Sequence, residues 1–388
     1  MTPVIRQVCS SIALASALLL VGCATVSPDG GTASLQSIAH QLPTGPARHD
    51  AVFPRPGVDA SAEISALLQL PLSADSAVRI ARLNNPGLQQ SLASQGVDIT
   101  NAALASHPAK IKATQDAALL GAQVRKAWIR AVAAGQSAQT ATGVKEAAEA
   151  GGELARRMAR AGNWSPLQQA RQQVFLADAA ADLIRAQETA FSARERLTVL
   201  LGLWGQDAER YILPAQLPDL PDAPRNETDL ERRVLERRQE LTLAAVQWQR
   251  QLTRPAPRGS DALWDALGEA AHVRGLAVQA RSEAREALFR YRTRYDLARH
   301  HDKEIVPLSR FINDEMVLRY NGMLSSVFDL LAESRAGAQA HARAMDARRD
   351  FWLADTDLDT VLSGLPLSFS DSAAESASTG SSSQPAGH

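Results

Sequence analysis

One segment near the middle of the chain specifies the architecture: residues 161–203 read AGNWSPLQQARQQVFLADAAADLIRAQETAFSARERLTVLLGL. Gly162 suits the position just after a helix, Ser165 suits an N-cap, and Pro166 suits the first turn of the next helix. In that next helix, mostly small and apolar side chains recur at alternating steps of four and three, as in the seam of a coiled coil. The seam positions are Leu176, Ala180, Leu183, Gln187, Ala190, Arg194, Leu197 and Leu201. We therefore predict a long helix that starts at a turn and packs along a partner helix.

The sequence before this turn predicts the partner helix. Residues 109–161 contain no proline, and an unbroken helix of this length would extend roughly 80 Å at 1.5 Å per residue. Glycines within it weaken the helix, so it needs neighbouring helices to hold it. A long helix, a glycine turn and a long return helix together form an antiparallel hairpin.

The same order of elements occurs again after a proline-rich linker at residues 204–226. Thr228 and Glu231 predict a capping box ahead of a short helix, and a second helix is expected at residues 240–252. A long helix should follow from residue 260 to about residue 320, with a kink at Pro307.

The second turn and the second return helix complete the copy. Asn321-Gly322 predicts the turn, and residues 325–362 predict the return helix, which ends before Gly364. The spacing Gly162-x-x-Ser165 recurs as Gly322-x-x-Ser325, so we equate the two turns.

Two short helices also precede the first long helix. Ser73 can cap the first of them, Pro86 opens the second, which should reach residue 106, and Pro108 should break it.

We predict an all-α fold, a tandem duplication of long antiparallel helical hairpins in a coiled-coil-like bundle, with no evident β-barrel. The repeats are residues 72–203 and 227–364, and their turns should lie at the same end of the body.

The two ends of the chain differ from this helical body. Residues 1–22 predict a signal peptide, and Leu20-Val21-Gly22-Cys23 resembles a bacterial lipoprotein box, in which the thiol of Cys23 would receive a diacylglycerol and the lipoprotein would carry palmitate. The alternative is an ordinary signal peptide with a chance cysteine. We expect residues 23–71 to be a flexible tether and residues 365–388, rich in serine, to be disordered.

Composition and motifs exclude several classes of function. The 388 residues carry 41 Lys and Arg against 42 Asp and Glu, a net charge of -1, which argues against a nucleic-acid partner. No phosphate-binding loop, nucleophile elbow or metalloprotease helix occurs, so we expect no enzymatic activity, no catalytic residues and no cofactor. His300-His301 invites a metal site, but adjacent residues of a helix point about 100° apart, so we interpret this segment as a solvated charged face and predict no metal site.

Three segments of the body resemble the TolC-like outer-membrane efflux family. They are Leu72 to Leu88 with Asn84-Asn85-Pro86-Gly87, Gly162-Asn163-Trp164-Ser165 through Leu201-Gly202-Leu203, and Tyr320-Asn321-Gly322-Met323 through Asp355-Thr356-Asp357-Leu358. The resemblance implies a homotrimer whose long hairpins form a periplasmic tube. It also implies partners: a periplasmic adaptor and an inner-membrane pump.

The resemblance also assigns roles to individual residues. The hairpin tips, which would contact the adaptor, are Gly162, Asn163, Ser165, Asn321, Gly322 and Ser325. Asp329 and Glu333 would lie at the periplasmic entrance of the pore. The alternative interpretation of the two tips is that they are simply turns. The alternative interpretation of Asp329 and Glu333 is that they are simply an exposed acidic pair.

The sequence departs from the family where members carry membrane strands between the long helices. The two gaps, residues 107–114 and 253–260, are shorter than the ~9–11 residues of one spanning strand. We expect an outer-membrane lipoprotein on the periplasmic face that exports small toxic solutes or metal ions with other proteins. The alternative is a non-conducting interaction or structural lipoprotein that kept the hairpins and lost the channel.

Overall fold

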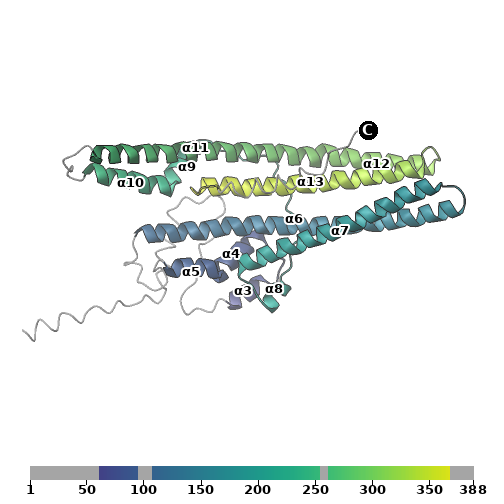
Figure 1. Ribbon diagram of the computed structural model, residues 1–388, viewed down its shortest axis with the longest axis horizontal. Coiled ribbons are helices and arrows are strands. Elements are labelled where there is room, and N and C mark those ends of the chain that lie inside the picture. Colours follow the sequence, from purple (N-terminus) through teal and green to yellow (C-terminus); the bar gives the residue numbers. More distant parts are fainter. Residues whose placement is uncertain (1–60, 95–106, 254–260, 368–388) are drawn as a thin grey trace, which may run out of the picture.

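The computed structural model describes residues 61–94, 107–253 and 261–367, and within these ranges every regular element is a helix. The predicted all-α fold is therefore confirmed for the described residues. None of their helices is long and apolar enough to cross a lipid bilayer. Two long helical hairpins dominate the molecule (Figure 1).

The first half contains one long hairpin and four short helices. Ser73 caps α4 as predicted, because its side chain accepts a hydrogen bond from the backbone N–H of Ser76. The elements are α3 (Ser61–Leu67), α4 (Ala74–Asn84), α5 (Pro86–Ser94), α6 (His107–Arg160), α7 (Pro166–Leu201) and α8 (Gln206–Arg210). The 54 residues of α6 form one continuous helix, as the absence of proline predicts.

The second half repeats this order with an interruption in its long helix. The elements are α9 (Leu230–Arg237), α10 (Gln239–Thr253), α11 (Asp261–His300), the π-helix η2 (His301–Ile305), α12 (Val306–Asn321) and α13 (Val327–Leu362). The interruption lies at Pro307, which has no N–H and whose ring would collide with the carbonyl of Lys303 in an α-helix. The N–H of Val306 therefore bonds to the carbonyl of His301, five residues back.

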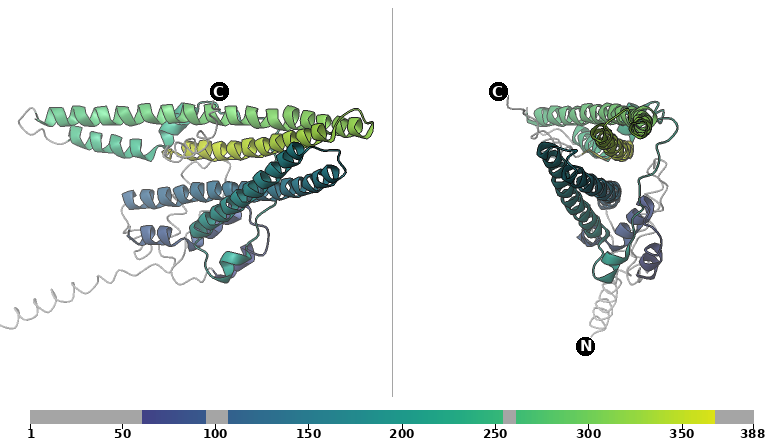
Figure 2. Two further views of the ribbon diagram at one scale, coloured as in Figure 1. Left: turned by 45° about the vertical axis from the view of Figure 1, so that its right-hand side comes forward. Right: turned by 90° about the vertical axis from the view of Figure 1, so that its right-hand side faces the viewer.

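The four long segments lie side by side in a fixed order. α6 packs against α7 on one side and α13 on the other, and α13 packs in turn against α11 and α12. Away from the tips, α7 and the α11–α12 helix are therefore the two outer edges of the layer, whereas near the tips α7 crosses α6 and contacts α13 (Figure 2). The two turns lie at the same end of the body, as predicted (Figure 1).

Each return helix ends against a short helix of its own half. Gly202 follows α7 with φ 68°, and a Cβ there would lie 2.4 Å from the carbonyl oxygen of Asn84 at the end of α4. Gly364 follows α13 with φ 78°, and a Cβ there would lie 2.2 Å from the carbonyl oxygen of Arg237 at the end of α9. Only glycine allows this close approach, so the same joint occurs in both halves.

Two expectations near the start of the body are wrong. The tether was expected to reach residue 71, but α3 forms and buries Ile64 and Leu68 against the core of the first half. Pro108 was expected to break a helix, but it lies in the first turn of α6, where the missing N–H needs no intrahelical partner. The preceding helix α5 ends at Ser94 and does not reach residue 106.

Two further boundaries also differ. Thr228 does not cap α9; the N-cap is Asp229, which has φ 54° and makes no side-chain cap bond. At the start of the Ser-rich tail, Leu365 is buried and so belongs to the body. Cys23, residues 1–22 of the signal peptide and residues 368–388 of the tail lie outside the described residues.

Candidate functional site

The first hairpin tip is a tight turn fixed by its own residues. Gly162 has φ 78°, and the N–H groups of Gly162 and Asn163 bond to the carbonyls of Ala159 and Met158, which closes the end of α6. Ser165 caps α7 with a capping box. The Gln168 N–H donates to the Ser165 hydroxyl, and the Ser165 N–H donates to the Gln168 side chain at 2.8 Å.

The second tip has the same geometry but shifted by one residue from the predicted alignment. Gly322 has φ -80°, an ordinary value, and the left-handed residue is Met323 at φ 57°. The N-cap is Ser326 rather than Ser325, and Asp329 completes its capping box. The predicted equivalence of Gly322 with Gly162 is therefore wrong, because Met323 takes the glycine position without being a glycine.

The two tips contact each other through an aromatic stack. The rings of Trp164 and Phe328 lie 4.2 Å apart between centroids and 21° from parallel. Trp164 is only 6% exposed, and Ala155 and Val327 are buried with it. From the sequence, Trp164 is predicted only to be part of a turn. Its partner Phe328 lies 164 positions away in the other hairpin, and no residue near either tip indicates this pairing.

A second link joins the hairpins further from the tips. The Arg335 guanidinium of α13 lies 3.6 Å above the ring of Phe175 in α7 and donates to the side-chain oxygen of Gln172 at 2.7 Å. Gln172 is buried, so this contact fixes the spacing of α7 and α13.

The two acidic candidates differ in their surroundings. The Asp329 carboxylate accepts from the Ser326 hydroxyl at 2.7 Å and from the Ser326 N–H at 3.0 Å. These hydrogen bonds lower the pKa of Asp329, so it is ionised at neutral pH. Glu333 lies one turn further along α13 and is partly exposed.

The predicted tip residues lie on the surface at one end of the molecule. Gly162, Asn163 and Ser165 are exposed, as are Asn321 and Gly322, while Ser325 is half-buried. Sequence reasoning missed the most exposed apolar side chains there, Met323 at 94% and Leu324 at 81%. The tips therefore combine an internal aromatic joint with an external apolar surface.

The outer edges of the layer carry stripes of exposed apolar side chains. On α7 the stripe consists of Leu167, Val174, Ile184, Phe191 and Val199, and on the α11–α12 helix it consists of Leu267, Val278, Phe289, Leu308, Phe311 and Leu318. The spacings on α7 are seven, ten, seven and eight residues, and those on the α11–α12 helix are mostly three, seven or eleven; each is close to one, two or three helical turns, so each stripe follows one side of its helix. Exposed apolar surface of this extent indicates an interaction site.

Comparison with known proteins identifies the fold. No family model and no curated protein matches the chain by sequence. A membrane protein from Pseudomonas aeruginosa matches with a TM-score of 0.57 at 16% identity, over 71% of this chain and 72% of the other. The Campylobacter jejuni CmeC outer membrane channel matches with 0.54 at 12% identity, over 69% and 68%. The outer membrane protein VceC from Vibrio cholerae matches with 0.53 at 13% identity, over 86% and 91%.

These matches confirm the resemblance at the level of the fold. The chain has the helical architecture of the TolC-like outer-membrane channels, with two tandem hairpins whose turns meet at one end.

Proposed function

We propose that this chain is the periplasmic helical component of an outer-membrane export assembly for small toxic solutes or metal ions, anchored through a lipid on Cys23. The observation that carries the proposal is the joined pair of hairpin tips, Trp164 stacked on Phe328, at one end of a layer with two apolar edges. A layer with this shape and this fold suits a wall segment of a tube. The proposal assigns no catalytic step to the chain.

The apolar edges support a homotrimer. The stripe on α7 and the stripe on the α11–α12 helix lie on different helices, which α6 and α13 separate away from the tips. A contact between two different surfaces is heterologous, and such contacts close into a ring when the rotation between subunits permits. Three copies would then form a tube with each α7 against the α11–α12 helix of its neighbour.

The tips support docking to a periplasmic adaptor that belongs to an inner-membrane pump. Met323 and Leu324 project from the second tip, and Leu167 is exposed beside the first. Burial of a leucine side chain contributes about 1.5–3 kcal/mol, so a partner that covers these residues gains appreciable affinity.

A growth assay tests the export role. Deletion of the gene should lower resistance to toxic solutes or metal ions, and the wild-type gene should restore it. Leu324→Asp, which places a charge on the exposed tip, should fail to restore resistance. Leu263→Asp is the matched control, because Leu263 is also exposed (60%) and lies in the first turn of α11, at the other end of the hairpin from the tips. Restoration by Leu324→Asp, or a deletion without phenotype, would contradict the proposal.

The lengths of two connections favour a second candidate, a non-conducting interaction lipoprotein. The predicted first gap, residues 107–114, is wrong because these residues lie in α6; the connection from α5 to α6 is residues 95–106, which has the length of one strand, and residues 254–260 join α10 to α11. Two membrane-spanning strands need about 20 residues, more than either connection has. We therefore expect the purified chain to give no stable conductance in planar bilayers. If the purified chain gives no conductance and deletion of the gene lowers resistance, the two results support export together with another outer-membrane subunit. If the chain gives no conductance and the deletion leaves resistance unchanged, the results support the second candidate.

A further inference from the structure

The exposed stripe on α7 has a counterpart on α13 that another hairpin covers. The helices α7 and α13 both have 36 residues and start 161 positions apart, and the left-handed residues of the two turns, Gly162 and Met323, are separated by the same number of positions. Each position of α7 is therefore equivalent to the position 161 residues later in α13. The stripe residues Leu167, Val174, Ile184, Phe191 and Val199 correspond to Phe328, Arg335, Met345, Trp352 and Thr360.

In α13 these positions belong to the contact with the first hairpin, which we call the internal interface. The contacts are those of Phe328 with Trp164, Arg335 with Phe175, Met345 with Thr140 and Trp352 with the core of the first half. Thr360 is buried and borders the cleft between α13 and the first hairpin. The stripe on α7 therefore repeats the covered side of α13, but it is exposed in the described chain.

The helix on the other side of the internal interface is α6, and its counterpart is the α11–α12 helix. Buried positions of α6 and α11 are 160 residues apart: Leu120, Val124, Ala127 and Ala131 correspond to Ala280, Ala284, Ala287 and Tyr291. After η2, whose π-turn holds one extra residue, the offset becomes 161. Lys126 and Gly151 of α6 therefore correspond to Glu286 and Ile312, and both of these residues are exposed.

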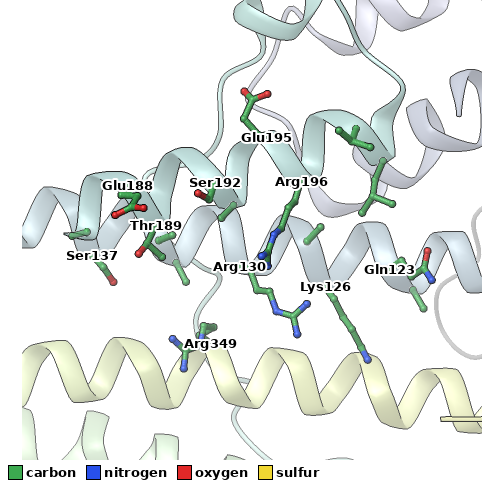
Figure 3. Close-up of a pocket in the computed structure, with 18 of the residues that line it drawn as sticks. Gln123, Lys126, Arg130, Ser137, Glu188, Thr189, Ser192, Glu195, Arg196 and Arg349 are labelled. Carbon is green, nitrogen blue, oxygen red and sulfur yellow. The ribbon is translucent and has the colours of Figure 1, made fainter. Parts of the chain in front are cut away.

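One ion pair of the internal interface has a counterpart with the charges reversed. Lys126 extends from α6 to α13, where it pairs with Asp357 (Figure 3). The equivalent residues are Glu286 of α11, a carboxylate, and Arg196 of α7, an exposed cation. Glu286 pairs with Arg290 at 2.7 Å on its own helix, and a carboxylate can accept several hydrogen bonds at once. A cation on α7 and a carboxylate on α11 thus suit each other as Lys126 and Asp357 do.

The side-chain sizes nearer to the tips are exchanged in the same way. Gly151 of α6 packs against Leu331 of α13, because a Cβ on Gly151 would lie 3.5 Å from the Leu331 side chain. The equivalent residues are Ile312 of α12, which is large, and Ala170 of α7, which is small. A large side chain opposite a small one fills a similar volume in either order.

We propose that the stripe on α7 binds the α11–α12 helix of a second copy of this chain in the register of the internal interface. Arg196 then pairs with Glu286 of the neighbouring copy, and Ala170 packs against Ile312 of that copy. Repeats of one fold bury their exposed sides by stacking on each other in the same way, so the contact between halves recurs between copies. This inference rests on the proposed homotrimer and adds the register and the paired residues to it.

The reversed ion pair also determines which hairpins can join. A contact between α6 and the α7 of another copy in this register would place Lys126 against Arg196. A contact between α11 and the α13 of another copy would place Glu286 against Asp357. Like charges disfavour both arrangements, so the first and second hairpins alternate around the tube.

Sedimentation equilibrium of the full chain tests the register by charge reversal. Arg196→Glu and Glu286→Arg should each raise the dissociation constant of the trimer roughly tenfold or more, because every interface of the ring exchanges an attraction for a repulsion. The double variant Arg196→Glu/Glu286→Arg should return to within about threefold of the wild type, because the pair is restored with its charges reversed. Recovery by the double variant also excludes misfolding as the cause of the loss.

Arg171→Glu is the matched control, because Arg171 is exposed on the same helix and the charge change is identical. Its equivalent in the second half, Ala332, is exposed, so the repeated interface leaves Arg171 uncovered. This variant should keep the dissociation constant within about twofold of the wild type.

The outcomes separate this proposal from the homotrimer itself. If the wild type and Arg196→Glu form trimers of equal stability, the register is overturned and the homotrimer stands. If the double variant does not recover, Arg196 and Glu286 are not partners and the proposal is overturned as well. If the wild type is monomeric at all concentrations, the homotrimer and the register both fail.

Discussion

Replacement of Trp164 by alanine should separate the two hairpin tips while both hairpins stay folded. Trp164 is 6% exposed, so almost all of its surface is lost from the joint, and truncation of a buried tryptophan costs about 3–5 kcal/mol. Stacking on Phe328 contributes about 0.5–1.5 kcal/mol beyond the buried area. The joint lies at the end of the molecule, where the helix ends can relax, so we expect the lower value of about 3 kcal/mol.

Hydrogen exchange measured by mass spectrometry reports this change locally. A cost of about 3 kcal/mol corresponds to roughly a hundredfold rise in the opening equilibrium of the tip. Amides in the last turns of α6 and the first turns of α13 should therefore exchange faster, while amides near Leu197 and Leu358, which are fully buried, should not change. Trp204→Ala is the control, because Trp204 is 86% exposed. If the tip amides of Trp164→Ala are as well protected from exchange as those of the wild type, the contact between Trp164 and Phe328 does not hold the tips together. If protection falls uniformly along the chain, the tips do not open locally.

Three further predictions follow from the turns and the anchor. Gly162→Ala should lower the free energy of unfolding by about 1–2 kcal/mol because φ is 78°, whereas Gly322→Ala, at φ -80°, should cost less than about 0.5 kcal/mol in denaturant titrations. The lowered pKa of Asp329 means that its cap is fully present above pH ~4 and is lost as pH falls through the folded-state pKa. Amide hydrogen exchange at the start of α13 should therefore become faster in acid. Exchange at the start of α7 should not gain this effect, because its cap uses the uncharged Gln168. An equal acid response of the two helix starts would contradict the prediction. Cys23→Ser should abolish palmitate labelling and release the protein from membranes, and retention of the variant would show another anchor.

The long elements follow from features that the sequence displays locally. A proline-free segment such as residues 109–161 and a periodic segment such as residues 166–201 permit little besides long helices. Ser165 and Pro166 specify the start of α7 by themselves, since a cap needs only the residues beside it.

The details of the candidate site depended on contacts between distant residues. Met323 adopts a left-handed backbone conformation that a residue with a side chain disfavours, so its residue type does not predict this conformation. The predicted alignment of the two turns through Gly322 was therefore displaced by one residue. The pairing of Trp164 with Phe328 and the burial of Ile64 in α3 both require a partner from elsewhere in the chain. Periodicity and turn residues carry no information about such partners.

The mass of the intact particle tests the central claim, that the layer is a wall segment of a trimeric tube, most directly. Native mass spectrometry should give three times the mass of the mature chain, which is the 41.6 kDa of the full sequence without residues 1–22 and with the lipid on Cys23. Phe191→Glu on the α7 edge and Phe289→Glu on the α11 edge should each give monomers with unchanged helical circular dichroism, because both side chains are exposed in the single chain. A monomeric wild type at all concentrations, or a trimer that survives both substitutions, would contradict the account.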